Sequence, residues 1–488
     1  MTVVHASRSR NATARSGDPA LPPLGRRSQD IRTSRIGWAL FLTTLVLLTP
    51  IVGPRTAQPS SRYALSAALV DDHSVDIGRF SAILGVDHAI YEGRWRSDKG
   101  PGQPVVAAGA YKLARLFGAG PLSSSSPVRG DLTLWWLTFA TALVPFATLI
   151  MLVYRRAART APGSALIGTV SVMAGSIILP HAVNLYAHTL SALLGFAAYT
   201  VLDPLVAATE GPSSGPAAPT SWRRLVGSGF LIGAAIATEY HLAIVALVIF
   251  ILVAQRHRVR GSVLYASGSI LPLLGLAFYQ WRAFGAPWRL PFAYYAGEIG
   301  GTTEGGYSLP TLRGVGWLFA GNRGLAISGP ILLVALGCAI WCVRRPSLDN
   351  LAVRSDSLIA IVIFLGYALL VTGWSGTLFL EEPGARYLIP AIPFLVVPLA
   401  HSWPKVARVG RICGIWGASL MIAATITVNL VPHDQSIVFG YIRYVARGQF
   451  RPTIWSIAFG PVGVLMYAAS AVLATRWLWQ TAKTRPHG

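Results

Sequence analysis

Charged residues are scarce in this chain of 488 residues, because Asp, Glu, Lys and Arg together make up 12% of it. A soluble domain carries about 25%. Hydrophobic residues reach 53%, so the composition excludes an ordinary soluble enzyme and a disordered protein. It indicates a membrane protein that crosses the bilayer many times, with about 20 residues for each span.

Cysteine is also scarce, since only Cys338, Cys342 and Cys413 occur. This excludes a disulfide framework and zinc sites built from cysteine pairs. The HExxH, P-loop and CxxC motifs are absent from the sequence. His181 and His188 are seven residues apart, about two helical turns, which is too far for one metal ion. The sequence therefore predicts no metal ligands, although a divalent metal remains possible as a cofactor.

Acidic residues are few beside basic ones, with 19 Asp and Glu against 41 Lys and Arg and a net charge of +22. In a soluble protein this excess would indicate nucleic-acid binding, but in membrane proteins basic residues gather in the cytoplasmic loops. An N-terminus placed inside makes every short inner loop basic and leaves most acidic residues outside. We therefore expect a multi-pass protein of the plasma (inner) membrane, with both termini cytoplasmic, the active face outward and no nucleic-acid partner.

Long apolar runs divide the chain. Residues 1–35 are arginine-rich and poor in large apolar residues, which predicts a disordered basic cytoplasmic tail. Residues 36–480 contain twelve apolar runs and are predicted to form a single transmembrane domain. Within it, residues 54–130 form a first outer loop and residues 280–323 a second outer segment. Residues 481–488 are expected to be a cytoplasmic tail.

The expected fold is that of an all-α polytopic membrane protein with about 12 transmembrane helices. Its large first outer loop should contain interfacial helices. Residues 62–70 favour a helix that is apolar on one side, so this segment is predicted to lie on the membrane and to end near Asp71. Asp72 and Asp76 are four residues apart and would share a face if the helix continued.

Polar residues of the first outer loop are candidates for chemistry. A carboxylate at the membrane surface can take a proton from a hydroxyl nucleophile, and the alternative is a solvated acidic loop. Lys99 precedes a Gly-Pro-Gly turn that permits close backbone approach. It could pair with phosphate oxygens or be an ordinary exposed lysine. The candidate bases are Asp71, Asp72, Asp76 and Asp98.

Two further charged residues stand at the outer ends of later apolar runs. Arg386 begins a predicted membrane helix, where it could hold an anionic head group or neutralise Glu381 or Glu382. Glu239 lies at a tight turn between two short apolar runs. It could line a cavity or be a solvated hairpin tip.

Three short motifs occur in the same order in a known superfamily. They are Arg62-Tyr63 after the first apolar run, the turn Asp98-Lys99-Gly100-Pro101, and Arg386-Tyr387 followed by Pro390 and Pro393. In these motifs the chain resembles the GT-C superfamily of membrane glycosyltransferases, which includes bacterial relatives of protein O-mannosyltransferases and the lipid A aminoarabinose transferases. The likeness covers most of residues 36–400.

The resemblance implies a donor sugar carried on a polyprenyl phosphate or pyrophosphate. It implies that a carboxylate of the first outer loop acts on the acceptor and that Lys99, Arg386 and Arg62 bind the donor phosphate. Separately from the resemblance, Tyr63, Glu239 and Tyr387 are candidates to line a cavity. The chain departs from the superfamily where many relatives carry an acidic pair before the Arg-Tyr motif, since Pro59 and Ser60 stand there. The catalytic base is therefore not fixed by the resemblance.

The predicted function is transfer of a sugar from a polyprenyl-phosphate donor to an acceptor on the outer face of the membrane. The partners implied are a lipid-linked sugar donor, a glycan, lipid or protein acceptor, and membrane lipids. The alternatives are a lipid or polysaccharide transporter or flippase, and a noncatalytic protein of envelope assembly. Few ionisable residues within the apolar runs and no internal repeat weigh against a transporter.

Overall fold

A computed structural model describes residues 23–118, 127–202, 221–296, 309–345, 350–373, 382–428 and 430–483. The described chain is almost entirely helical, in agreement with the expected all-α membrane fold. The exception among these residues is a short antiparallel hairpin, in which β1 (Ala89–Tyr91) pairs with β2 (Arg94–Arg96).

Six described stretches are long and apolar enough to cross a membrane, or seven if the bent pair Leu312–Ser328 and Pro330–Arg344 forms one span. They support a multi-pass membrane protein, but they do not confirm about twelve spans. One reason is α12 (Ala243–Phe284), a single element broken at Arg258, where φ is 50°. Two of the twelve expected apolar runs form the parts of this helix before and after the break. The six stretches are Gln29–Leu48, Leu132–Thr160, Tyr240–Phe284, Leu351–Thr372, Arg386–Ile426 and Ile454–Lys483.

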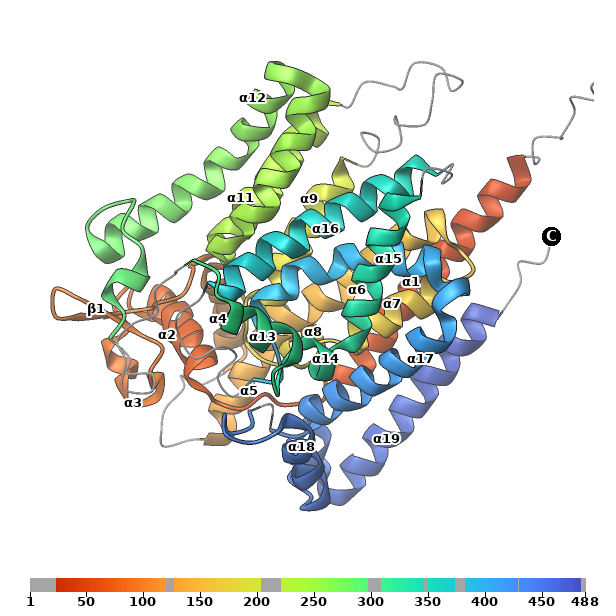
Figure 1. The fold of residues 1–488 in the computed structure, drawn as a ribbon. Helices are drawn as coiled ribbons and strands as arrows, with labels where there is room; N and C mark the ends of the chain where they lie inside the picture. Colours follow the sequence, from red (N-terminus) through yellow and green to blue (C-terminus); the bar gives the residue numbers. More distant parts are fainter. Residues whose placement is uncertain are drawn as a thin grey trace, which may run out of the picture.

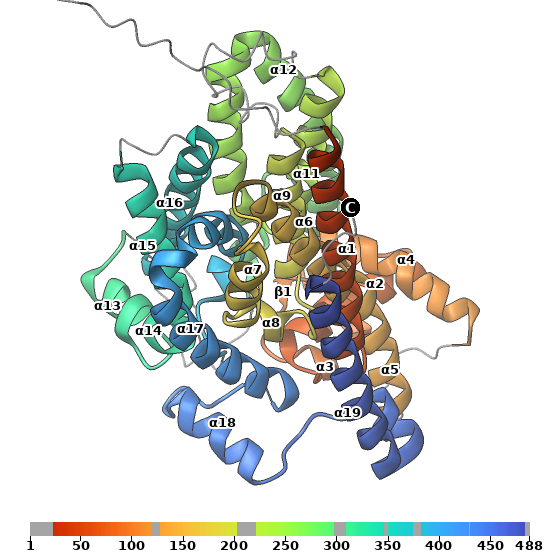
Figure 2. The same cartoon turned by 90° about the vertical axis from the view of Figure 1, so that its right-hand side faces the viewer.

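The long helices lie side by side. α1 (Pro23–Leu48) packs against α6 (Val144–Thr160) and α19 (Ile454–Lys483), and Figures 1 and 2 both show α1 beside α19. A guanidinium nitrogen of Arg32 donates to the carbonyl of Ala482 over 3.0 Å. The beginning of α1 and the end of α19 therefore share one side of the bundle.

The outermost helices extend into the segments expected to be tails. α1 begins at Pro23, so residues 23–35 are helical, and the prediction of a disordered tail over 1–35 is wrong for this part. The polar Arg and Gln residues before the apolar run are good helix formers, so the helix extends back through them. α19 continues to Lys483. Residues 1–22 and 484–488 lie outside the described part of the chain.

The remaining helices fill the bundle. α11 (Trp222–Thr238) packs between α9 (His188–Val201) and α12. α17 (Val396–Ile426) packs against α7 (Ala165–Ala174) and α15 (Pro330–Arg344). The other elements are the π-helix η2 (Phe139–Leu143), α8 (Ile178–His181), η3 (Tyr240–Leu242), η4 (Pro291–Tyr294), α13 (Leu312–Ala320), α14 (Leu325–Ser328), α16 (Leu351–Thr372), η5 (Arg386–Leu395) and α18 (Ile437–Ala446).

The expected first outer loop is a packed helical segment with its own small core, and we call it the first outer segment after that expectation. α2 ends at Asp71, as the sequence predicts. Tyr63 of α2 and Tyr111 of α4 are buried in this core, where their rings meet edge to face with centroids 5.8 Å apart. Figure 1 shows the segment at the end of the bundle opposite the beginning of α1. Its elements are α2 (Ala57–Asp71), η1 (Gly78–Phe80), α3 (Ser81–Leu84), the β1–β2 hairpin and α4 (Gly102–Leu116), followed by α5 (Pro127–Thr138).

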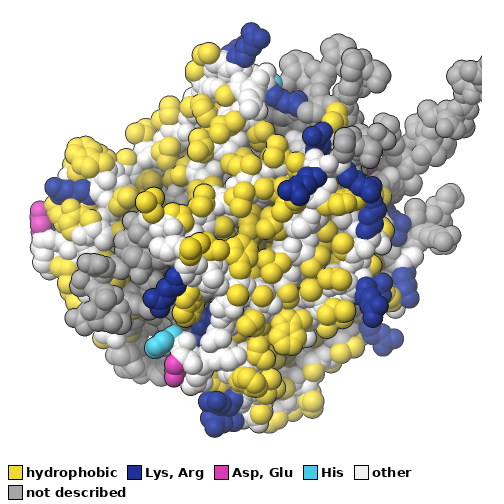
Figure 3. All heavy atoms as spheres, in the orientation of Figure 1, with side chains coloured by type: hydrophobic (Ala, Val, Ile, Leu, Met, Phe, Trp, Pro, Cys, Tyr) yellow, Lys and Arg dark blue, Asp and Glu magenta, His cyan; other side chains and the backbone are white. Residues whose placement is uncertain are grey.

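The surface is apolar over wide areas. Figure 3 shows hydrophobic side chains across the face that it presents, with most basic side chains near the edges. On α19 the side chains of Leu465 and Leu473 are 71% and 65% exposed. Contiguous apolar surface of this extent is what a membrane protein presents to lipid tails.

Candidate functional site

Charged side chains from distant parts of the chain meet in the interior, next to the first outer segment. Such burial is costly unless the charges are paired, and each charge in this group has an ionic partner. The group comes from α2, the loops before α4, the turn after α11, and the entry to η5. We call it the ionic cluster; its members are Arg62, Asp87, Asp98, Lys99, Glu239, Glu382 and Arg386.

Lys99 is held between two carboxylates. Its Nζ donates to Asp87 Oδ1 and to Asp98 Oδ2, each over 2.6 Å. Its side chain is only 13% exposed, so the alternative of an ordinary exposed turn lysine is wrong. Burial lowers the pKa of Lys99, but the two carboxylates outweigh it and raise that pKa above its ordinary value.

The turn after Lys99 is built from glycine because it packs directly on the end of α11. A Cβ on Gly100 would lie 2.7 Å from the carbonyl oxygen of Thr238, and one on Gly102 would lie 2.5 Å from the Thr238 hydroxyl. Neither approach leaves room for a side chain. The two glycines therefore bring Lys99 next to the turn that carries Glu239.

Asp98 is the buried acid of this turn, with 2% of its surface exposed. Ser61 of α2 donates to Asp98 Oδ1 over 3.3 Å, and Lys99 donates to the other oxygen. Burial raises the pKa of Asp98 above its ordinary value, although Lys99 opposes the shift. Asp98 is thus a carboxylate oriented by two donors inside the site.

Arg62 and Glu239 form the centre of the ionic cluster. Arg62 Nη2 donates to Glu239 Oε1 over 2.6 Å, and 1% of Arg62 is exposed. Glu239 follows the last residue of α11 in an extended conformation and is 9% exposed, so the alternative of a solvated hairpin tip is wrong. The Nε and Nη1 atoms of Arg62 are buried and have no partner among the described residues.

Arg386 pairs with Glu382 four residues before it, over 2.7 Å. This is one of the two pairings considered from the sequence; Glu381 lies outside the described residues. Glu382 also contacts His181 Nε2 over 3.1 Å. Burial opposes ionisation of Glu382, but Arg386 and His181 hold its pKa at about 2. Gln58 of α2 lies 3.2 Å from the Arg386 guanidinium when its amide oxygen faces that group.

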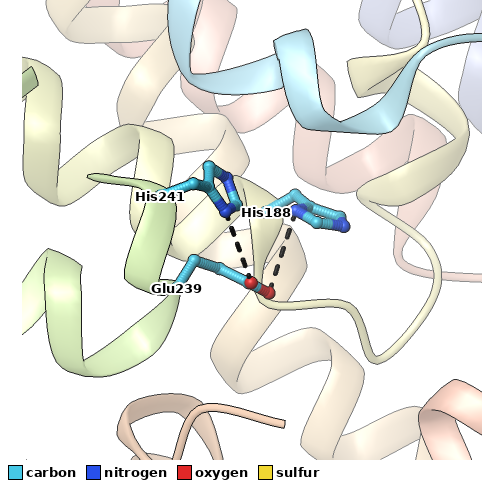
Figure 4. A group of neighbouring side chains, drawn as sticks. All are labelled: His188, Glu239 and His241. Atoms are coloured by element: carbon cyan, nitrogen blue, oxygen red, sulfur yellow. Dashed lines mark ion pairs between the residues drawn. The ribbon is translucent and has the colours of Figure 1, made fainter. Parts of the chain in front are cut away.

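Two histidines stand against Glu239, as Figure 4 shows. His188 Nδ1, at the start of α9, lies 3.8 Å from Glu239 Oε1, and His241 Nδ1 lies 3.8 Å from Glu239 Oε2. The Tyr387 ring meets both imidazoles edge to face, with centroids 6.0 and 5.4 Å apart. Together, His188, Glu239 and His241 could hold a metal ion, since their ligand atoms all lie within 4.8 Å of one another.

Sequence reasoning missed this trio because it compared His188 with His181, its neighbour in sequence. The predicted separation of the two histidines is wrong, because α8 ends at His181 and α9 begins at His188, and their ring centroids are 5.4 Å apart. The fold gives His181 a different partner, the Glu382 carboxylate, and brings His188 to a turn about 50 residues further along the chain. The spacing Glu239-x-His241 was the available signal, because a short turn can place two residues of that spacing around one point.

Three of the predicted acids and one tyrosine lie elsewhere. Asp71 accepts from Arg79 and Tyr111 over 3.0 and 2.9 Å, and Asp72 pairs with Arg79 over 2.8 Å. Because α2 ends at Asp71, Asp72 and Asp76 do not share a helical face. The remaining pairs are Asp76 with Arg96 at 3.5 Å, and Tyr63 packed against Phe80 and Tyr111.

The structure therefore brings together six of the ten residues singled out from the sequence. The other four, which are three aspartates of the loop and Tyr63, lie elsewhere. The six are Arg62, Asp98, Lys99, Glu239, Arg386 and Tyr387. The Arg62-Tyr63 pair is split, because adjacent residues of a helix point in different directions. Arg62 enters the ionic cluster, and Tyr63 enters the core of the first outer segment.

No protein-family model and no curated protein matches the sequence. Among solved structures, the chain is similar to the oligosaccharyltransferase of Archaeoglobus fulgidus in the apo form, with a TM-score of 0.48 and 13% identity over 90% of this chain. It is also similar to AglB of the same organism in complex with an inhibitory peptide and a dolichol-phosphate, with a TM-score of 0.47 and 12% identity over 90% of this chain. The chain spans 59% of the length of each.

Proposed function

We propose that the protein is a membrane glycosyltransferase that moves a sugar from a polyprenyl-phosphate donor to an acceptor. The observation that carries the proposal is Arg62, whose Nε and Nη1 atoms are buried without a partner among the described residues. A buried guanidinium loses the free energy of every hydrogen bond that it does not make. Phosphate oxygens are strong acceptors for a guanidinium and could accept from these donors.

Lys99 and Arg386 are assigned to the same donor phosphate. Both belong to the ionic cluster with Arg62, and both are already oriented by carboxylates, Lys99 by Asp87 and Asp98 and Arg386 by Glu382. Cations fixed before the substrate arrives stabilise developing negative charge without reorganisation. The polyprenyl chain would stay in the bilayer, against the apolar outer faces of the spanning helices.

Asp98 is the base that we assign among the four candidate aspartates, because it is the one within the ionic cluster. In the reaction, the acceptor oxygen forms a bond to the anomeric carbon as the bond from that carbon to the donor phosphate oxygen breaks. The acceptor proton passes to an oxygen of Asp98, and polyprenyl phosphate leaves with the electron pair. A base in this position contributes roughly 10²–10⁴-fold to the rate.

The site is proposed to open to the outer face of a plasma (inner) membrane, with both termini cytoplasmic. The side shared by the beginning of α1 and the end of α19 is opposite the first outer segment (Figure 1). Leu116→Cys tests this orientation in a Cys413→Ser background, since Leu116 is 76% exposed while Cys338 and Cys342 are buried. Outer-face labelling of residue 116 by a membrane-impermeant maleimide supports the orientation. Labelling from the cytoplasmic side alone contradicts it.

The function itself is tested with the purified full-length protein and a panel of polyprenyl-phosphate sugars. Donor cleavage coupled to glycosylation of an acceptor supports the proposal. Movement of labelled lipid across vesicles without donor cleavage would instead favour the transporter. Arg94→Ala is a matched control for Arg62→Ala, because Arg94 is an exposed arginine of the neighbouring hairpin.

A further inference from the structure

We infer that His188, Glu239 and His241 form a binding site for one divalent transition-metal ion of the zinc type. The site goes beyond the proposed function, since it would bind the ion whether or not the chain transfers a sugar. Three independent features support it: the spacing of the ligand atoms, the lack of other partners for the imidazoles, and the charge balance of the surrounding cluster.

The ligand atoms are close enough to bind one ion. Each histidine Nδ1 lies 3.8 Å from an oxygen of Glu239, and all three ligand atoms lie within 4.8 Å of one another. Two ligands at about 2.1 Å from one ion in a tetrahedral arrangement are separated by roughly 3.4 Å. Small side-chain rotations would therefore bring the three onto one ion, and Figure 4 shows both imidazoles facing the carboxylate.

Three buried imidazole nitrogens of the two histidines have no hydrogen-bond partner among the described residues. His188 is 1% exposed, and neither of its ring nitrogens has a partner among the described residues. His241 Nε2 is also buried and unpartnered. A buried ring nitrogen without a partner is costly, and a bound ion or water is one explanation for such a group in a native structure. A metal ion bound through Nδ1 would satisfy one of the unpartnered nitrogens of His188.

The charge of the ionic cluster favours a cation. Its described members comprise three basic side chains and four carboxylates, with two histidines beside them. The formal charge is thus negative before any ligand binds. A divalent ion would make it positive. Arg62 occupies Glu239 Oε1, which leaves Oε2 for the ion, and a carboxylate bound to a metal is commonly hydrogen-bonded through its second oxygen.

The donor set indicates the class of ion. Two imidazoles and one carboxylate are the ligands of catalytic zinc sites, in which three protein ligands leave one coordination position open. Carbonyl-rich and carboxylate-rich sites, which suit magnesium and calcium, need more oxygen ligands than this trio supplies. If the proposed function holds, the open position would lie near Arg62, which pairs with Glu239, and a phosphate oxygen or an acceptor hydroxyl could fill it.

The inference is tested by metal binding alone, without a sugar donor. The full-length protein in detergent is stripped with a chelator, dialysed and titrated with Co²⁺, then with Zn²⁺ in competition. We expect one equivalent of Co²⁺ with the visible absorption of a low-coordinate nitrogen–oxygen site, displaced by Zn²⁺. Groups that only orient a ligand contribute roughly 10–100-fold to affinity, so His188→Ala and His241→Ala, which remove ligands, should each weaken binding by at least about 100-fold.

His257→Ala is the control, because His257 also has an unpartnered buried Nε2 but lies outside the described group. It should bind Co²⁺ as the parent does. Both site variants keep the Arg62–Glu239 pair, and gel filtration with thermal unfolding checks that they remain folded. Equal binding by the parent, the site variants and the control would overturn the inference, as would no binding by the parent. Absence of transfer activity in a parent protein that binds Co²⁺ would count against the proposed function and would leave the metal site standing.

Discussion

Arg62 donates to Glu239 over 2.6 Å, although the two residues are 177 positions apart in the chain. The bond joins the middle of α2 to the end of α11. Both side chains are nearly excluded from solvent, at 2% and 12% exposure. The pair fixes the first outer segment against the helix bundle. It also orients the remaining N–H groups of Arg62, on which the proposed binding of the lipid-linked sugar depends.

Removing one partner of this pair should destabilise the fold more than removing both. Arg62→Ala leaves a buried unpaired carboxylate, and loss of one partner of a buried ion pair costs about 3–5 kcal/mol. The double variant Arg62→Ala/Glu239→Ala leaves no such charge and should recover part of that loss. Unfolding of the single and double variants in detergent measures the coupling. Additive effects within about 0.5 kcal/mol would contradict a direct pair.

Asp98→Asn should depress turnover by ~10²–10⁴-fold while donor affinity changes less, because a base acts on the acceptor proton and not on donor binding. The control is Asp72→Asn, since Asp72 pairs with a half-exposed arginine at the surface of the segment. That variant should retain the parental rate. Transfer by Asp98→Asn at the parental rate would show that the base lies elsewhere.

Lys99→Ala and Arg386→Ala should weaken donor binding, because each removes a cation that the cluster holds in place for the phosphate. Turnover should fall as well if the contact strengthens as the phosphate leaves. Lys112→Ala, at an exposed position of α4, is the matched control for Lys99. Donor affinity is measured with a labelled polyprenyl-phosphate sugar under conditions without an acceptor. Unchanged affinity in both variants would leave Lys99 and Arg386 with structural roles alone.

Acid stability should depend on Glu382. Its pKa in the folded protein is about 2, below the ordinary 4.5, because of Arg386 and His181. A depressed folded pKa adds stability that is fully present above pH 4.5 and is lost as the pH falls toward 2, by about 3 kcal/mol in total. Glu382→Gln should therefore flatten the loss of stability over this range. Unfolding midpoints against pH measure it, with Glu92→Gln at the exposed hairpin turn as the control. Parallel pH curves for the parent and Glu382→Gln would refute the linkage.

Local patterns in the sequence predicted what depends on neighbouring residues. The apolar runs indicated a helical membrane protein, and the amphipathic segment 62–70 indicated a helix ending near Asp71, which is where α2 ends. Run length does not reveal where a helix bends, however. The break at Arg258 and the 103° bend between the helices on either side of Gly329 are two places where the expected runs do not form separate straight spans.

Contacts between distant segments were predicted only in part. The superfamily resemblance pointed to Arg62, Lys99 and Arg386, which do meet in the ionic cluster. It did not point to Asp87, the second partner of Lys99, or to the two histidines beside Glu239. These residues carry no local signal, because their partners come from other helices. Selecting aspartates by their place in the outer loop admitted three that pair with arginines of the first outer segment.

The central claim is that Arg62 binds the phosphate of a lipid-linked sugar that the protein cleaves. The most direct measurement is the release of polyprenyl phosphate from a labelled donor by the purified parent, Arg62→Lys and Arg94→Ala. Arg62→Lys keeps a charge beside Glu239 but lacks the additional N–H donors that the guanidinium offers to phosphate oxygens. We predict release by the parent and by Arg94→Ala, and a loss of at least about tenfold in Arg62→Lys. Equal release by all three, or no release by the folded parent with any donor of the panel, would contradict the claim.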